Sequence, residues 1–202
     1  VKESIDQLKS ASMMLNNRPE ELEKRIPIVT RMTETALENL MPLGAPEKPS
    51  EGKRQHTVGI DVRFREGPGG TVPLLGYLDF YYPQHNLVVD LKTTSKSPSK
   101  WALGHGIQAA VYQKAIESMT GKKPAVKFAY ALTRKKDPYV ELELTDEDAA
   151  DFLKQFKQTV IQMEALLSMT DDSQKIISVL PHNPDTFYWN NAEEIRKTFY
   201  GS

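Results

Sequence analysis

The stretch that decides the fold is residues 76–94, which read GYLDFYYPQHNLVVDLKTT. Its two apolar runs flank the sequence Pro-Gln-His-Asn at residues 83–86, and apolar runs separated by such a short turn-forming segment predict a β hairpin. We expect its strands at about residues 72–82 and 87–93. An alternating pattern of apolar residues at residues 56–64 adds a third strand, and the three together read as an antiparallel meander.

The hairpin brings charged side chains together. Successive side chains of a strand point to opposite faces, so Asp90 and Lys92 project side by side from the face that they share with Val88. If the turn is centred between residues 84 and 85, Asp79 lies directly opposite Asp90. The hairpin register therefore predicts a pair of facing carboxylates with a lysine next to it.

Two facing carboxylates need a compensating charge. At about 5 Å they repel by roughly 3 kcal/mol at an effective dielectric constant of about 20. A divalent cation offsets this repulsion, and a site with only oxygen ligands suits Mg²⁺ or Mn²⁺. Water on such a metal can attack a phosphodiester, and Lys92 could orient or deprotonate that water or stabilise the transition state. The alternative is a solvent-facing strand that carries ordinary Asp and Lys residues.

The next segment, Trp101–Met119, has the pattern of a helix. Its expected apolar face consists of Leu103, Ile107, Val111, Ala115 and Met119. A second stripe carries His105, Gln108 and Tyr112, of which the last two lie one turn apart and can point at a common partner. They could supply donors to a phosphate, hold a lysine in position, or form a half-buried hydrogen-bonded pair. For His105 a structural role is the simpler interpretation.

The order of elements predicts the fold class. Helices are expected up to Leu40, with a break near residues 16–19, followed by a polar connector at residues 42–55. After the hairpin and the helix come two strands and a long helix, at about residues 125–133, 139–144 and 145–167. We expect an α/β (α+β) fold with a central mixed sheet of about five strands flanked by helices. The expected division is a helical segment and connector, residues 1–55, and a main domain, residues 56–202.

Composition and charge bound the function. The 202 residues include no cysteine, which excludes disulfide scaffolds, thiolate zinc sites and cysteine-ligated iron–sulfur clusters, and no apolar run is long enough to span a membrane. The net charge is −1, but Lys92 to Lys136 contains ten basic residues and one acidic residue, Glu117. Lys96, Lys100 and Lys114 belong to this basic stretch and are candidates to contact phosphates; chance clustering of surface lysines is the alternative.

These motifs together resemble the PD-(D/E)XK nuclease superfamily, in particular its RecB-like exonuclease branch. The similarity rests on Gly-x-Leu-Asp at residues 76–79, Asp-Leu-Lys-Thr-Thr at residues 90–94, and Gln-x-x-x-Tyr at residues 108–112. It implies that Asp79, Asp90 and the Leu91 carbonyl bind the metal and that Lys92 is catalytic. It also implies that Gln108 and Tyr112 lie at the active site and near the nucleic acid. Relatives usually add an upstream Glu or His, for which Glu34 and Glu38 are candidates.

The resemblance implies a Mg²⁺- or Mn²⁺-dependent deoxyribonuclease, an exonuclease of recombination, repair or phage replication. Its expected partner is DNA, single- or double-stranded, together with other replication or recombination proteins, and no membrane. We expect a cytoplasmic protein of bacterial or phage origin, with an organelle matrix as the alternative location. The sequence pattern indicates no oligomeric state. The alternative functions are a non-catalytic nucleic-acid-binding module that retains the nuclease fold, and a purely structural or protein-binding domain.

Overall fold

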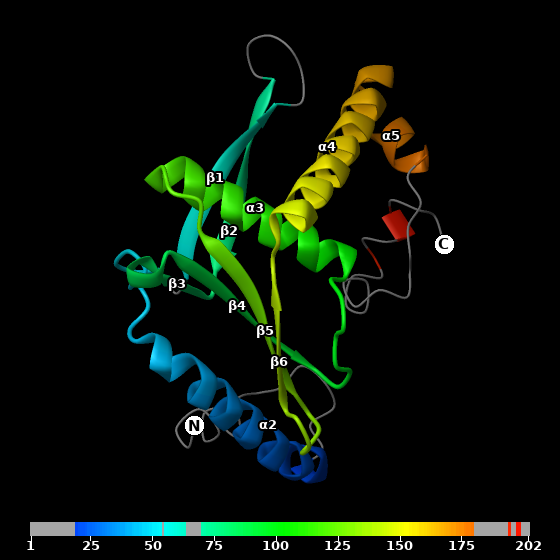
Figure 1. The fold of residues 1–202 in the computed structure, drawn as a ribbon. Helices are drawn as coiled ribbons and strands as arrows, with labels where there is room; N and C mark the ends of the chain where they lie inside the picture. The colour runs from blue at the N-terminus through cyan, green and yellow to red at the C-terminus, as the bar shows by residue number, and fades with distance from the viewer. Residues whose placement is uncertain (1–18, 54, 64–69, 180–193, 195–196, 199–202) are drawn as a thin grey trace. The chain divides into compact units, whose positions relative to one another are not determined.

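The computed structural model describes residues 19–53, 55–63, 70–179, 194 and 197–198 (Figure 1). Within these residues the main elements follow in the order α2 (Pro19–Leu40), β1 (His56–Arg63), β2 (Thr71–Leu78), β3 (Phe80–Tyr82), β4 (Leu87–Thr94), α3 (Leu103–Thr120), β5 (Ala125–Leu132), β6 (Tyr139–Glu143), α4 (Asp146–Met169) and α5 (Ser173–Val179). Short 3₁₀ helices occupy Met41–Leu43 and Pro83–His85. The helix expected before residue 16 lies outside the described residues. None of the described helices is long and apolar enough to cross a membrane.

The described residues divide into two compact units. The first contains those up to Asp61 together with Pro73–Lys154, and the second contains those of Val62–Val72 and from Gln155 onward. All the predicted site residues lie in the first unit, which is the subject of the following paragraphs. The predicted boundary at residue 55 stays a prediction.

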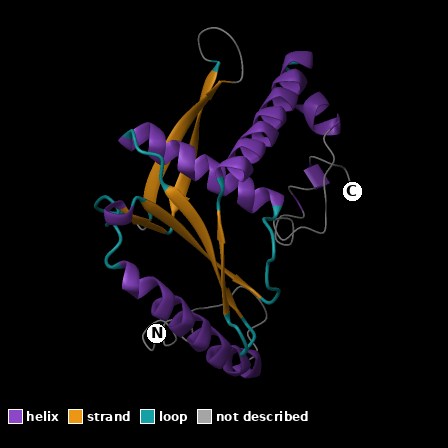
Figure 2. Cartoon of the chain, viewed as in Figure 1, coloured by secondary structure: helices purple, strands orange, loops and turns teal. Residues whose placement is uncertain are grey.

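The central sheet has the strand order β3-β4-β5-β6, and β1 pairs with β2 in a separate two-stranded sheet (Figure 2). Strands β4 and β5 are parallel, whereas β3 and β6 run antiparallel to their neighbours. The mixed α/β class is therefore confirmed. The strand expected at about residues 72–82 differs in one respect, because a bend at Asp79 divides it into β2 and β3.

The hairpin register agrees with the sequence analysis. Phe80 pairs with Val89 and Tyr82 pairs with Leu87, which is the pairing that a turn centred between residues 84 and 85 requires. Asn86 closes the turn in the left-handed conformation, with φ 47° and ψ 48°, a geometry that Asn tolerates better than most residues. Val88, Asp90 and Lys92 consequently share one face of β4.

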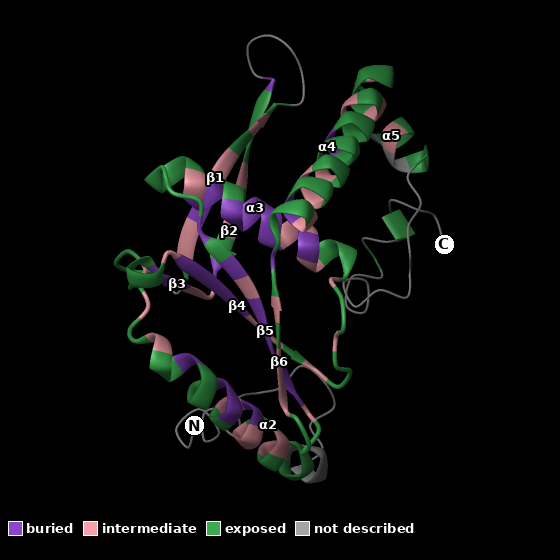
Figure 3. Cartoon of the chain, viewed as in Figure 1, coloured by how far each residue is buried: buried purple, intermediate pink, exposed green. Residues whose placement is uncertain are grey.

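The two faces of the sheet are covered by different helices. Helix α3, the crossover between parallel strands β4 and β5, packs its residues Ala109 and Ile116 against the face that contains Val88 and Phe128. On the opposite face, Leu40 at the end of α2 packs with Val89 and Ala129. Figure 1 shows the two helices on either side of the sheet, and Figure 3 shows the buried residues concentrated between these layers. Asp90 therefore projects toward α3 and away from α2.

The buried face of α3 agrees only in part with the one that the apolar pattern indicated, since Val111 and Ala115 are buried as expected. Leu103 and Met119, expected on the apolar face, are each 54% exposed. The buried positions begin instead with small residues, since Gly106, Ala109 and Ala110 are in contact with the core. Small side chains allow the helix axis to approach the sheet closely, so size rather than hydrophobicity determines which face packs.

Gly106 gives the first testable prediction. A Cβ at this position would meet the ring of Phe152 at 2.2 Å. Overpacking of this kind costs about 1–3 kcal/mol, which outweighs the roughly 1 kcal/mol that alanine gains over glycine in a helix. We expect Gly106→Ala to lower the melting temperature, measured by circular dichroism. The matched control is Gly104→Ala, where nothing lies within 4 Å and a small increase is expected; a similar increase for both variants would contradict the packing.

Candidate active site

Asp90 is a buried carboxylate in the middle of β4. It is only 2% exposed, and its Oδ1 lies 2.6 Å from Nζ of Lys92. Its Oδ2 receives a long hydrogen bond of 3.4 Å from Nε2 of Gln108. Apart from the ion-pair contact with Lys92, Oδ1 has no partner in hydrogen-bonding geometry among the described residues. A buried oxygen in this condition has lone pairs to offer to a further ligand.

Asp79 lies at the bend between β2 and β3. Its Oδ2 accepts a 3.0 Å hydrogen bond from the Leu91 amide, and its Oδ1 accepts one of 2.7 Å from Nε2 of Gln55. The side chain thus binds the backbone of β4 next to Asp90, at the position where regular strand pairing stops. Gln55 was not foreseen as a site residue, because the polar connector in which it lies contains no motif.

Burial dominates the electrostatics of this pair. The pKa of Asp90 is raised above its ordinary value, mainly because burial disfavours the charged form. The ammonium of Lys92 opposes this shift, while the carboxylate of Asp79 adds to it. The site therefore holds more negative charge than the interior stabilises by itself, which favours a bound cation.

The raised pKa predicts a pH-dependent stability difference in the absence of metal. Asp90 ionises in the unfolded chain near its ordinary pKa of 3.8 and at a higher pH in the folded chain. Between the two values the unfolded state binds fewer protons, so the free energy of unfolding falls as pH rises. An asparagine at this position does not ionise, so the free energy of unfolding of the variant does not fall for this reason.

We therefore expect Asp90→Asn to gain stability relative to the wild type as the pH rises above the ordinary pKa of 3.8, measured as melting temperature in EDTA. A difference between the two proteins that does not change with pH would show that Lys92 fully compensates the buried charge.

Gln108 and Tyr112 hold Asp90 from α3. Nε2 of Gln108 lies 2.6 Å from the Tyr112 hydroxyl, which donates a 2.7 Å hydrogen bond to the Tyr77 carbonyl. Tyr112 is 5% exposed, and burial raises the pKa of its hydroxyl, so the hydroxyl keeps the proton that it donates. The two residues bond to each other rather than to a common third group, so they form the half-buried hydrogen-bonded pair that was one of the alternatives. With its hydroxyl already engaged, Tyr112 serves to position Gln108 and Asp90.

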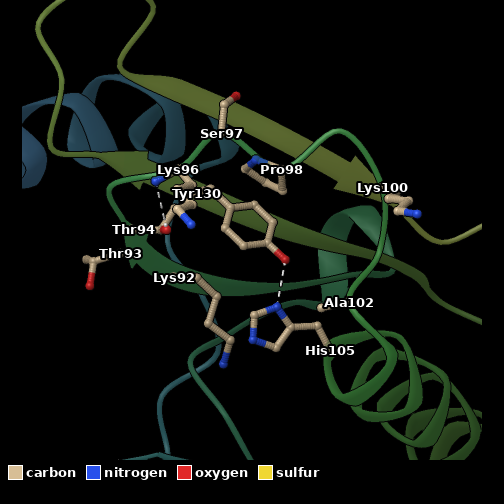
Figure 4. A pocket seen from close by; sticks show the side chains of 10 residues that line it. All are labelled: Lys92, Thr93, Thr94, Lys96, Ser97, Pro98, Lys100, Ala102, His105 and Tyr130. Atoms are coloured by element: carbon tan, nitrogen blue, oxygen red, sulfur yellow. Dashed lines mark hydrogen bonds between the residues drawn. The ribbon is translucent and has the colours of Figure 1, made fainter.

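Lys92 contacts Asp90 and also lines an open pocket. Its side chain is 27% exposed, and Nζ lies 5.1 Å from the centre of the Phe128 ring. The pocket has a volume of about 320 Å³ and is lined by Lys92, Thr93, Thr94, Lys96, Ser97, Pro98, Lys100, Ala102, His105 and Tyr130 (Figure 4). Lys96 and Lys100, the candidates to contact phosphates, thus line the same pocket as Lys92.

One wall of the pocket is formed by a histidine and a tyrosine. Nδ1 of His105 lies 2.9 Å from the Tyr130 hydroxyl, and Figure 4 shows the two side chains pointing toward each other. Burial and then the charge of Lys92 lower the pKa of His105, so that the imidazole is neutral at neutral pH. The structural role preferred for His105 fits this hydrogen bond. Tyr130 was missed, because a tyrosine in an apolar strand gives no signal of its own.

Three other candidates lie apart from the carboxylate pair. Glu34 and Glu38 are exposed on α2, which packs against the other face of the sheet. In the part of the chain that the structure describes, no third His, Asp or Glu joins Asp79 and Asp90. Lys114 is exposed on α3 and forms an ion pair of 2.6 Å with Glu117.

Comparison with known proteins gives information on the family and on the fold. A sequence model of the PD-(D/E)XK nuclease superfamily matches residues 2–176. The fold is similar to the crystal structure of a candidate exonuclease from Eubacterium rectale, with a TM-score of 0.54 and 17% identity over 100% of this chain and 75% of that one. The structure of SSO0001 is less similar, with a TM-score of 0.41 and 15% identity over 81% of this chain and 71% of that one. No curated protein matches the chain.

Proposed function

The chain belongs to the PD-(D/E)XK nuclease superfamily, and from this premise we propose that it is a metal-dependent exonuclease that hydrolyses the phosphodiester bonds of DNA in recombination, repair or phage replication. The observation that carries the proposal is the buried Asp90. Its Oδ1 lacks a hydrogen-bond partner among the described residues, and Lys92 beside it opens onto a pocket. Buried charges in proteins are paired or coordinate metals, and perturbed, buried acids are frequent at functional sites.

The donor set suits a hard cation. Asp79 and Asp90 supply carboxylate oxygens, the Leu91 carbonyl can add a third oxygen, and Mg²⁺ and Mn²⁺ prefer such ligands together with several waters. The hydrogen bonds on Asp79 do not prevent binding, because each carboxylate oxygen has two lone pairs. When bound, the metal supplies an activated water and neutralises charge on the phosphate.

The protein's own residues supply position and charge. Lys92 can donate hydrogen bonds to a phosphate oxygen and stabilise the negative charge that develops there during attack. Gln108 holds Asp90, and Tyr112 holds Gln108 through its bond to the β2 backbone. Asp79, Asp90 and Tyr112 are each bonded to a group on another element, which reduces the reorganisation that the reaction requires.

The test is degradation of end-labelled linear DNA with Mg²⁺ or Mn²⁺, compared with EDTA. We expect cleavage only with the metal and none by Asp90→Asn. Covalently closed circular DNA separates the alternatives, because an exonuclease leaves it intact whereas an endonuclease cuts it. A matched RNA strand establishes the preferred sugar. Absence of metal-dependent cleavage of every substrate would contradict the proposal.

The second candidate is a nucleic-acid-binding module that retains the nuclease fold without catalysis. It is favoured by one observation, that the described residues provide no third acidic or histidine ligand beside Asp79 and Asp90. This function predicts salt-sensitive binding without turnover and no specific uptake of Mn²⁺. Metal-dependent cleavage would exclude it.

A further inference from the structure

The basic stretch from Lys92 to Lys136 is divided in space. Because β4 and β5 are parallel, their first residues lie at one end of the sheet and their last residues at the other. Lys96 and Lys100 follow β4, and Arg134, Lys135 and Lys136 follow β5, so these five residues gather at the carboxyl ends of the two strands. We call them the basic end.

The remaining lysines lie elsewhere and are largely neutralised. Lys123 pairs with Asp146 at 2.5 Å, and Lys127 pairs with Glu141 at 3.2 Å and with Glu143 at 3.5 Å. Lys123 and the exposed Lys122 precede β5, at the opposite end of the sheet, and Lys127 lies near the start of β5. Lys114 is paired with Glu117 on α3. Among the described residues, by contrast, no acidic side chain forms an ion pair within 4.0 Å of any member of the basic end.

The two segments of the basic end are joined by a backbone hydrogen bond. The Thr133 amide donates to the Thr94 carbonyl at 3.0 Å, so the turn after β5 begins beside the loop after β4. Within the turn, Nε of Arg134 donates to the Asp137 carbonyl at 3.1 Å, and the Leu132 amide donates to the Pro138 carbonyl at 2.7 Å. All five basic side chains are on exposed residues. The turn is thus a fixed extension of the pocket wall that carries Lys96.

The pocket connects this surface to the reaction site. Lys92 lies at its inner side beside Asp90, and Lys96 and Lys100 lie on its rim-forming loop (Figure 4). Ammonium groups, hydroxyls and exposed backbone amides are the groups that bind phosphate oxygens. From Lys92, basic side chains without an acidic partner among the described residues therefore continue along the pocket toward the carboxyl ends of β4 and β5.

We infer that one strand of the nucleic acid leaves the reaction site through this pocket and crosses the basic end, where Lys96, Lys100, Arg134, Lys135 and Lys136 bind its successive phosphates. The inference rests on the proposed function and adds the path of the substrate. It assigns phosphate binding to the turn after β5. It excludes Lys114 from the interface, because that lysine lies on α3 and is paired there with Glu117.

The experiment compares two double variants that lose the same charge. Lys135→Gln with Lys136→Gln alters the basic end, and Lys122→Gln with Lys123→Gln alters the opposite end of the sheet. Binding of a fluorescent single-stranded oligonucleotide is measured by anisotropy in EDTA across a range of KCl concentrations. A contact to single-stranded nucleic acid contributes about 0.7 to the salt slope, so two lost contacts lower it by about 1.4 and raise the Kd roughly 25-fold at about 0.1 M salt.

We expect this change for the first variant only, with the control close to the wild type. Equal losses in both variants would show that net charge alone matters, and no loss in the first would show that the strand takes another path; either result overturns the inference. Polyglutamate serves as a competitor of acidic-protein character. If the first variant bound polyglutamate more weakly but the oligonucleotide as well as the wild type does, the surface would bind an acidic protein, and this result would also overturn the inference. Cleavage is measured on the same preparations, so wild-type cleavage with unchanged binding rejects the path alone, whereas a wild type that neither binds nor cleaves rejects the proposed function.

Discussion

Replacing Lys92 with Met is expected to lower the kcat for phosphodiester cleavage by about 10²–10³-fold, the usual cost of removing one preorganised group that stabilises charge in the transition state. Met keeps the apolar stem that extends past the Phe128 ring and removes only the ammonium group. Because Lys92 is not a proposed metal ligand, Mn²⁺ binding should persist in this variant. The measurement is single-turnover cleavage of labelled DNA together with a Mn²⁺ titration.

The control for this prediction is Lys122→Met, which removes one exposed ammonium group at the opposite end of the sheet. It should cleave like the wild type. If Lys92→Met also retained its rate, Lys92 would have no part in the reaction and its contact with Asp90 would be a structural ion pair. If it lost Mn²⁺ together with activity, its role would be to hold Asp90 in place for the metal.

The second large effect is expected from Gly76→Ala. A Cβ on Gly76 would lie 2.8 Å from Cε1 of Tyr112 and 3.3 Å from Cγ2 of Val58. The tyrosine ring has little freedom to move, because its hydroxyl donates to the Tyr77 carbonyl and contacts Gln108. The ring must therefore shift and take Gln108 with it, away from Asp90. Misplacement on the order of 1 Å can cost about 10²-fold in rate, and overpacking adds about 1–3 kcal/mol of destabilisation.

Gly59→Ala provides the matched control in the adjacent strand β1. There a Cβ would meet the flexible end of Leu75 at 3.3 Å and no site residue. We expect Gly76→Ala to lose activity at a temperature where circular dichroism shows it folded, and Gly59→Ala to keep it. Full activity of Gly76→Ala would show that the Tyr112 position does not matter to the reaction.

The local pattern of the sequence was sufficient to predict the hairpin. Apolar alternation and a compact turn fix the register within a narrow range, and Phe80 indeed pairs with Val89. A one-residue slip would turn both Asp90 and Lys92 toward α2 and Val89 and Leu91 toward α3, so the register decides where the charged residues of the site lie. The spacing of Gln108 and Tyr112 was informative because residues one helical turn apart are neighbours on the helix surface, and the two side chains indeed contact each other.

Features that depend on contacts between distant segments could not be predicted. The buried face of α3 is set by how closely Gly106 lets the helix approach Phe152, and small residues carry little signal in an apolar pattern. The bend at Asp79 follows from its hydrogen bonds with Leu91 and Gln55, of which the second reaches across 24 positions of sequence. The separation of paired from unpaired lysines likewise required the partners on β6 and α4.

The central claim is that Asp90 is a buried metal ligand, and Mn²⁺ binding to the purified protein measures this most directly. Isothermal titration of the wild type and of Asp90→Asn, at a pH where the carboxylate is ionised, compares two proteins that differ in one side-chain atom. We expect specific Mn²⁺ binding by the wild type that is lost in Asp90→Asn while the variant remains folded. Equal Mn²⁺ binding by both proteins, or none by the wild type, would contradict it.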